Sequence, residues 1–272
     1  AITAADLVMS SGKYDIVTDF RSLFGSTKST KDCILYRTYD ADKGVTHSIA
    51  STCNMNDPTD VGPNLDLIKA FICTDGKDWQ TSAVANAADF TLSNLIKTRD
   101  ARFEASFYNK PTPRAKSCYL YVTKFIPRSA LEYIEKGGSP APEFQGEKNV
   151  TGYPVIRYAD VILMYAEALN QNGKTAEACK YLNMTRRRGF GYQTTETSPV
   201  DLQTTDKAQF ALMVEQERRV ELAFENHRWF DLIRTGRAVE VMRSKGFSLN
   251  ETNLICPVSY THLRAHETAA NL

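Results

Sequence analysis

The sequence predicts a mainly α-helical protein built on TPR-like helical hairpins, with an irregular loop-rich region and a few short β-strands. From residue 154 onward, apolar side chains recur at helical spacing, and the turn Asn172-Gly173 divides them into two helices. Two helices joined by a tight turn form the hairpin of TPR-like repeats. By contrast, the segments 40–63 and 137–152 are rich in glycine, proline and polar residues, which is typical of loops.

The length and the net charge limit the classes of protein to which the chain can belong. A chain of 272 residues can bury a full hydrophobic core, as one large or two ordinary domains. Its 33 lysines and arginines nearly balance its 32 aspartates and glutamates, which gives no general attraction for nucleic acid or an anionic membrane. No apolar run approaches the roughly 20 residues of a membrane-spanning helix. We therefore expect no nucleic-acid partner and no membrane span.

The first half of the chain alternates short elements with loops. Gly12 is expected to end an amphipathic helix at the start of the chain. Residues 33–39 have the β-branched and aromatic composition of a strand, and residues 64–73 form a short helix. Residues 102–108 alternate apolar and polar side chains, which predicts a half-buried strand that pairs with residues 118–125.

Four more helices are predicted after the first helix of the hairpin and its turn. Thr175 is expected to cap the second helix of the hairpin, and Asp206 to cap a long third helix that ends at Asn226. Shorter helices are predicted over residues 228–235 and 237–244.

The third helix carries two carboxylates on its apolar face. The face begins at Phe210 and continues three, four, seven, eleven and fourteen residues later, with Met213, Val214, Glu217, Glu221 and Phe224. A charge on such a face is costly unless it is paired and hydrogen-bonded. The same stretch supplies possible partners, namely Arg218, Arg219, Arg228 and Arg234.

Two interpretations of this acidic pair are open. Glu217 and Glu221 either belong to a buried ion network that fixes the fold, or form the acid pair of a glycosidase, whose carboxyls lie about 5–9 Å apart. Neighbouring arginines lower carboxyl pKa values, whereas a general acid needs a raised one. The ion network is therefore the favoured interpretation, and no catalytic residue is assigned.

No metal or cofactor site is predicted. The six cysteines are scattered singly and resemble small buried hydrophobes. His262 and His266 lie one turn apart but lack a well-placed third ligand. Asp75 and Asp78 resemble a calcium loop, but Lys77 occupies a ligand position and no glutamate closes the loop, so we predict a turn.

Trp79 lies in the polar segment DGKDWQTS, where a partly exposed indole is expected. Sugars stack against flat aromatic faces, but a lone tryptophan also packs at the base of a loop. Both interpretations of Trp79 are open. Trp229, which stands in an apolar context, is expected to belong to the core.

Longer segments resemble the SusD/RagB family of outer-membrane nutrient-binding lipoproteins of Bacteroidetes. The similarity is dense in YPVIRYADVILMYAEALN, CKYLNMTRRRG and VEQERRVELAFENHRWFDLIRTGRA, and weaker in SSGKYDIVTDFRSLF, NLDLIKAFICTDGK, TRDARF and VTKF. It covers about residues 1–257 in order, with the tight matches at 153–240. Ala101 stands where the family commonly has proline, and the pattern fails after Pro257.

The resemblance implies TPR-like hairpins, a loop-rich ligand-binding portion, no catalysis and no cofactor. The resemblance also implies that the protein covers a SusC-like TonB-dependent outer-membrane transporter as a lid. Family members capture oligosaccharide, or in some members peptide, for import. A surface-exposed position on the outer membrane is implied, through a lipid anchor on an N-terminal half that this sequence lacks. The implied ion network comprises Glu217, Arg218, Arg219, Glu221, Arg228 and Asp231.

Three portions of the chain are expected on this basis. Residues 1–152 form the loop-rich ligand-binding portion, which opens with the end of a TPR-like helix at 1–12. Residues 153–257 form the TPR-like helical core, and residues 258–272 are a tail foreign to the fold.

Ligand contacts are expected from loop aromatics, with Trp79 first, followed by Tyr108 and Tyr119. Three rival hypotheses remain beside oligosaccharide capture. They are a peptide-binding member of the same family, a TPR-type scaffold that binds a protein partner, and a glycosidase that uses the acidic pair of the third helix.

Overall fold

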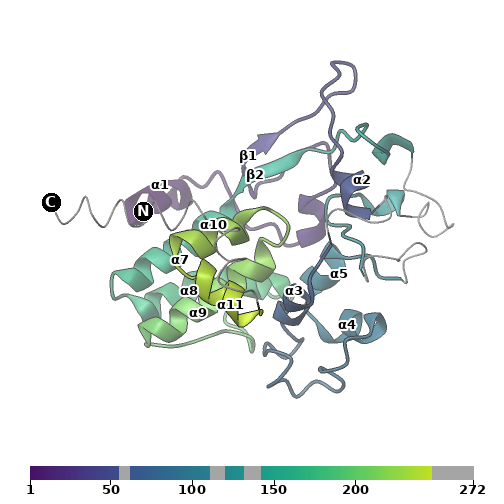
Figure 1. Ribbon diagram of the computed structural model, residues 1–272. Helices are drawn as coiled ribbons and strands as arrows, with labels where there is room; N and C mark the ends of the chain where they lie inside the picture. Colours follow the sequence, from purple (N-terminus) through teal and green to yellow (C-terminus); the bar gives the residue numbers. More distant parts are fainter. Residues whose placement is uncertain (55–61, 111–119, 132–141, 247–272) are drawn as a thin grey trace. The chain divides into compact units, whose positions relative to one another are not determined.

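In the computed structural model, the predicted hairpin lies at the centre of a group of four helices. Helices α7 (Tyr158–Gln171) and α8 (Thr175–Gly189) pack against each other across the turn at Gly173, whose φ is +77°. Helix α9 (Lys207–Glu221) packs on both, and α1 (Ile2–Ser10) packs on α7 (Figure 1). The mainly α-helical class is thereby confirmed.

The structure describes residues 1–54, 62–110, 120–131 and 142–246. Two compact units are distinguished within the chain, residues 1–221 and residues 222–272, and each is described by itself. The predicted division at residue 152 stays a prediction, and the proposed tail at 258–272 lies outside the described residues. No helix in the described ranges combines the length and the apolar character that crossing a membrane requires.

The helices of the hairpin group share one apolar core. Its residues are buried at 8% exposure or less and come from α1 and α7 to α9: Ala5, Val161, Leu163, Tyr165, Ala166, Leu169, Ala178, Cys179, Leu182, Phe210 and Val214. Their spacing follows the helical period along each element, as the sequence indicates. The cysteines Cys33, Cys53, Cys73 and Cys179 are free and buried, as expected for small hydrophobes.

The predicted start of α9 is correct, whereas the predicted end of α9 and the predicted cap of α8 are wrong. Asp206 Oδ1 accepts hydrogen bonds from the backbone N–H groups of residues 208 and 209, at 2.7 and 3.0 Å, so it caps α9. Thr175 does not cap α8, because its hydroxyl donates to Asn170 Oδ1 at the end of α7. Asn226 does not end the third helix either, since α9 stops at Glu221 and Asn226, with φ +65°, precedes the next helix.

Strand β1 (Cys33–Arg37) is confirmed, and its partner is a segment that the sequence analysis assigned to a helix. Strand β2 (Tyr153–Arg157) pairs with it antiparallel, with Arg37 opposite Tyr153 and Cys33 opposite Arg157. The helix predicted from residue 154 therefore begins only at Tyr158. Two β-branched residues after Pro154 favour the extended conformation.

The predicted strand at 102–108 is wrong. Residues Ala101–Ser106 form helix α5, and Asp100 caps it by accepting from the N–H of Arg102 at 2.9 Å. Both sides of this short helix are buried, so its apolar residues show no helical period. An isolated antiparallel bridge joins Phe107 to Val122, and residues 118 and 119 of the expected partner segment lie outside the described ranges.

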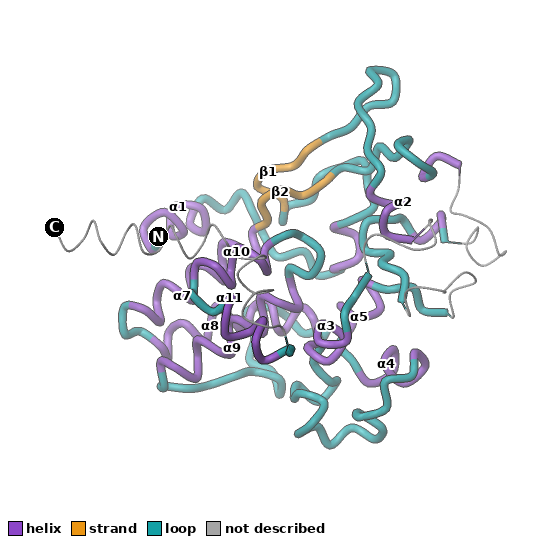
Figure 2. The backbone as a smooth tube through the Cα atoms, viewed as in Figure 1, coloured by secondary structure: helices purple, strands orange, loops and turns teal. Residues whose placement is uncertain are grey.

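Most of the chain between β1 and β2 consists of loops (Figure 2). Its helices are short: α2 (Ile49–Asn54), α3 (Leu65–Ala70) and α4 (Leu92–Thr98), with 3-10 turns at Arg128–Ala130 and Pro142–Phe144. The predicted helix near 64–73 is thus confirmed as α3, capped by Asn64 and packed against α9. A further 3-10 turn, η1 (Phe20–Leu23), precedes β1 and packs against α5.

In the second unit, α10 (His227–Arg234) and α11 (Ala238–Ser244) pack on each other. Leu232 and Ala238 form a small buried cluster with Trp229 and Val241 against it, so Trp229 does pack in an apolar cluster. Both short helices were predicted, with bounds that differ by one residue.

A buried ion network joins α9 to three other elements of the first unit. Nη1 of Arg102, on α5, lies 2.6 Å from Oε1 of Glu217 and 3.2 Å from Oε2 of Glu221. The other oxygen of Glu221 pairs with Arg157 of β2, 3.0 Å away, and with Arg188 of α8. Glu221 therefore binds α9 to α5, β2 and α8 at once.

Further carboxylates extend the network. Arg157 also pairs with Asp32 at 2.7 Å, and Arg102 with Asp100 at 2.9 Å. Asp32 in addition accepts the N–H of residue 159, at the start of α7. The Arg157 guanidinium thus has two acidic partners and that of Arg102 has three, which partly offsets the cost of their burial.

Two aromatic rings flank the cations of the network. The Lys124 ammonium lies 5.0 Å from the ring centre of Phe20 and 4.5 Å from that of Phe24. Arg157 lies 5.8 and 5.4 Å from the same two rings, and Arg188 lies 4.8 Å from Phe20. The negative faces of the rings add to the neutralisation of the positive charges.

The network keeps Glu221 ionised. Burial by itself raises the pKa of this carboxyl, but Arg188, Arg157, Arg102 and Lys124 outweigh it and hold the pKa well below its usual range. The side chains of Glu217 and Glu221 are 1% and 0% exposed.

The partners of the two glutamates come from distant parts of the chain, and the sequence analysis missed them. They are Arg102, Arg157, Arg186 and Arg188. Successive residues of a helix point in different directions, so an adjacent arginine does not face the same side as its glutamate. Nothing in the local sequence marks which distant arginines meet this face.

The arginines that lie near Glu217 and Glu221 in the sequence occupy other positions in the structure. Arg218 pairs with Asp160 of α7 at 2.7 Å, where both are buried. Within the second unit, Asp231 pairs with Arg234 at 2.8 Å. Arg219 on α9 and Arg228 on α10 are half-buried.

We expect Glu221→Gln to lower the free energy of unfolding by about 3–5 kcal/mol, because it leaves buried guanidinium groups without their counter-charge. Urea unfolding followed by circular dichroism measures the change. Glu177→Gln is the matched control, since Glu177 pairs with Lys174 at the surface and contributes little. A Glu221→Gln protein as stable as the control would contradict the network's structural role.

Acid should weaken the fold through the same carboxyl. The pKa of Glu221 is lower in the folded than in the unfolded chain, so its stabilisation is present above the unfolded value of about 4.3 and is lost as the pH falls below it. The free energy of unfolding should therefore decrease as the pH drops below about 4. The decrease should be less steep in the Glu221→Gln protein. Parallel pH profiles for the two proteins would contradict this.

Candidate functional site

The two glutamates of α9 offer no access to a substrate. Glu217 and Glu221 are almost completely buried and paired with guanidinium groups. The pKa of Glu221 is shifted away from the range of a general acid, because burial is outweighed by the surrounding cations. Of the two interpretations of this pair, the geometry favours the structural network, so a binding site has to be sought elsewhere.

Trp79, by contrast, is partly exposed on a loop that follows α3. Its ring meets that of Phe90 edge to face, with centroids 5.2 Å apart. The Lys69 ammonium, at the end of α3, lies 5.4 Å from the Trp79 ring centre and 5.8 Å from that of Phe90. Three segments of chain therefore meet at an aromatic pair with a cation beside it.

Hydrogen bonds of two aspartates shape the loop that carries Trp79. Asp75 accepts from the N–H of Lys77, the hydroxyl of Ser82 and the N–H of residue 83, at 2.9–3.2 Å. Asp78 accepts from the N–H groups of residues 80 and 81 and from the Thr81 hydroxyl. Burial tends to raise the pKa of Asp75, but the hydrogen bonds and Lys77 lower it overall. The predicted turn is confirmed, with the carboxylates directed at the loop's own groups.

The loop is also anchored at its base. Cys73 and Arg99 form an antiparallel bridge, and the backbone oxygen of Gly76 accepts a hydrogen bond from Arg186 of α8. A Cβ at Gly76 would lie 3.1–3.2 Å from Val200 and Arg186, and φ here is +81°, so glycine is required. Trp79 is thereby held on a fixed loop.

The other two predicted ligand residues differ from Trp79. Tyr108 is 2% exposed and packs in a cluster with Tyr121 and Ile126, so its ring presents no face to a ligand in this structure. Tyr119 lies outside the described residues. The sequence analysis did not single out Phe90 or Lys69, because neither belongs to a local pattern that points to Trp79.

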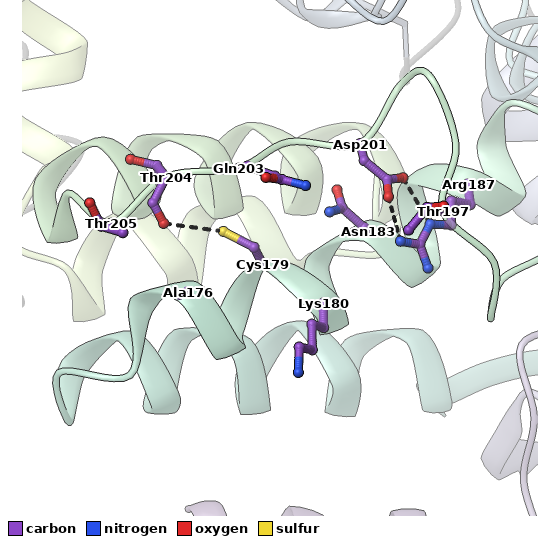
Figure 3. A pocket seen from close by; sticks show the side chains of 10 residues that line it. All are labelled: Ala176, Cys179, Lys180, Asn183, Arg187, Thr197, Asp201, Gln203, Thr204 and Thr205. Atoms are coloured by element: carbon purple, nitrogen blue, oxygen red, sulfur yellow. Dashed lines mark hydrogen bonds and ion pairs between the residues drawn. The ribbon is translucent and has the colours of Figure 1, made fainter.

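A groove of about 550 Å³ runs along α8 beneath residues 197–205 (Figure 3). Arg187 and Asp201 meet as an ion pair at one end of it, and Cys179 contacts the backbone oxygen of Thr204 at 3.6 Å. Asn183 exchanges two hydrogen bonds with the backbone of residue 202. These side chains hold the segment on the helix, and the ten lining residues include no aromatic ring.

A second cleft, of about 410 Å³, lies between the Trp79 loop and α9. Lys77, Asp78 and Thr81 line it from the loop, and Leu212 and Gln216 from the helix. Within the described ranges, no group of three histidine, cysteine or acidic residues is arranged to hold a metal ion. A partly exposed aromatic pair on an ordered loop is what sugar stacking requires, so we take Trp79 and its neighbours as the candidate site.

Comparison with known proteins agrees with this architecture. The sequence model of the SusD family matches residues 31–255. SusD-like protein P38 of Formosa agariphila is 39% identical over 114 residues, which cover 42% of this chain and 22% of that protein. SusD-like protein P25 of the same organism is 40% identical over 89 residues, covering 33% and 16%.

Solved structures show the same fold. A SusD-like carbohydrate-binding protein of Bacteroides fragilis superposes with a TM-score of 0.67 at 24% identity, over 89% of this chain and 49% of that one. Surface glycan-binding protein A of Bacteroides fluxus superposes with a TM-score of 0.55 at 18% identity, over 88% and 48%. The chain thus spans about half the length of these structures. Because the family match covers most of its residues, the chain belongs to the SusD family.

Proposed function

We propose that this protein captures oligosaccharides at the cell surface and presents them to a SusC-like TonB-dependent transporter of the outer membrane. Membership of the SusD family supports the proposal. Relatives of similar fold are named for carbohydrate or glycan binding. The observation that carries it for this chain is the Trp79–Phe90 pair, partly exposed on a loop held by its own hydrogen bonds.

The physical case is one of preorganisation. A sugar ring has apolar C–H faces that pack on an indole, and a fixed indole loses little conformational entropy when the sugar binds. The Asp75 and Asp78 hydrogen bonds fix the loop before any ligand arrives. Binding without turnover fits the same structure, because the acidic pair of α9 is sealed by its ion network.

The location that we propose in the cell follows from membership of the SusD family. A surface position on the outer membrane, held by a lipid anchor, is what the family implies. The transporter is then the partner that receives the ligand. A peptide ligand remains the alternative within the family, and a mixed array of glycans and peptides separates the two.

We expect Trp79→Ala to weaken the binding of a glycan identified on such an array by about tenfold or more, or roughly 1.4 kcal/mol, through loss of the stacking surface. Isothermal titration calorimetry measures the affinity. Tyr192→Ala is the control, because Tyr192 is an aromatic residue of another segment, after α8, and is 43% exposed. Equal affinities for the Trp79→Ala and control proteins, with both folded by circular dichroism, would remove Trp79 from the site.

A further inference from the structure

Two cations flank the Trp79–Phe90 pair, and neither forms an ion pair within the described residues. The Lys69 ammonium lies within 6 Å of both ring centres, and the Arg99 guanidinium lies 5.5 Å from that of Phe90. Among the residues that the structure describes, neither Lys69 nor Arg99 forms an ion pair with a carboxylate. In contrast, the arginines that surround α9 are all paired with acidic groups.

Arg99 is the more unusual of the two, because it is only 3% exposed. Its Nη1 donates to the Thr98 hydroxyl at 2.8 Å and its Nη2 to the backbone oxygen of Ala87 at 2.9 Å. Its Nε has no acceptor in the described part of the structure. Buried charges are normally paired with a counter-charge, but the hydrogen bonds of this guanidinium go to neutral acceptors, and the neighbouring Asp100, which partly offsets its charge, is paired with Arg102.

The acidic residues of the same loops are engaged elsewhere. Asp75 and Asp78 accept hydrogen bonds from their own turn. Asp89 accepts the N–H of Thr91 at 2.9 Å and the side-chain amide of Asn94. Their oxygens are used locally, and no ion pair within the described residues links them to Lys69 or Arg99. A carboxylate or sulfate group of a ligand is therefore a suitable partner for the Lys69 ammonium.

We propose that the Trp79 site selects acidic glycans, in which a sugar ring stacks on Trp79 and its carboxylate or sulfate group binds the Lys69 ammonium. Lys69 is the contact residue, because its side chain is partly exposed. Arg99 acts from behind Phe90 and adds positive potential at the same place. The inference rests on the proposed glycan-binding function and names the class of glycan.

A purely structural role for Lys69 makes a different prediction. An ammonium beside an aromatic ring contributes about 0.5–1 kcal/mol at an exposed site, whatever the ligand. If Lys69 only held the two rings in place, removing its charge would weaken the binding of neutral and acidic glycans equally. Selectivity between matched glycans therefore separates the two roles.

The test uses the full 272-residue chain and pairs of oligosaccharides that differ only in charge. One set compares oligomers of a neutral hexose with their C6-oxidised uronic acid forms, and the other compares oligomers with and without sulfate. Calorimetry at low and high salt gives the affinities. The unsubstituted protein should prefer the acidic member of a pair by about tenfold at low salt, and less at high salt.

Lys69→Met keeps the apolar stem and removes the charge, so the ratio of acidic to neutral affinity should fall to near parity. Lys69→Arg should restore most of the preference. Lys97→Met, at an exposed lysine of α4, is the matched control and should keep the preference. The two ligand sets show whether carboxylate, sulfate or both groups are selected.

Two outcomes would overturn the inference. One is an unsubstituted protein that binds matched neutral and acidic glycans equally, and the other is a Lys69→Met protein that keeps the full acidic preference. If Trp79→Ala still weakens both members of a pair in these cases, the proposed function stands and only the acidic selectivity fails. A protein that binds no glycan in either set contradicts the proposed function and this inference together.

Discussion

The structure depends on the neutralisation of two carboxylates that α9 places in the interior. Glu217 and Glu221 lie on the buried side of the helix, where an unpaired charge would cost several kcal/mol. The chain meets this constraint by bringing Arg102, Arg157 and Arg188 from three separate elements to the same place. Because each guanidinium belongs to a different element, satisfying the charges also fixes how α5, β2 and α8 lie against α9.

The same constraint separates framework from binding surface. A network of this kind has fixed geometry and excludes water, so it suits a scaffold and not a ligand site that must exchange sugars. The network reaches the segment between β1 and β2 through Asp100, Arg102 and Lys124, whereas the Trp79 loop is held by local hydrogen bonds that Asp75 and Asp78 accept. Changes of sequence in such a loop alter the ligand surface at little cost to the core. Lys69, which has no ion pair with any residue that the structure describes, is then available for recognition.

Much of the fold could be predicted from the sequence because the signals are local. Helical spacing, the turn at Gly173 and the Asp206 cap each act over a few residues, and all three are observed. The failures occurred where tertiary contacts override the local pattern. Helix α5 is buried on both sides, so its residues showed a false alternation. Segment 153–157 is extended because it pairs with β1, more than a hundred residues earlier.

The site was only partly predictable for the same reason. Trp79 could be singled out, because an indole in a polar loop is unusual, and the turn formed by Asp75 and Asp78 was also recognisable. Its neighbours Phe90 and Lys69 come from other segments, and no periodicity relates them to Trp79. Likewise, the glutamates of α9 were recognisable as a buried pair, whereas Arg102 and Arg157 were not recognisable as their partners.

The most direct measurement of the central claim is an NMR titration of the glutamate side-chain carboxyl carbons in the folded protein. We expect Glu221 to remain ionised as the pH falls through about 4.3, where an ordinary glutamate takes up its proton. Its signal should shift only when the fold itself is lost. A Glu221 carboxyl that titrates in the folded protein at or above the ordinary value would contradict the account, since it would show a carboxyl that is not held by the surrounding guanidinium groups.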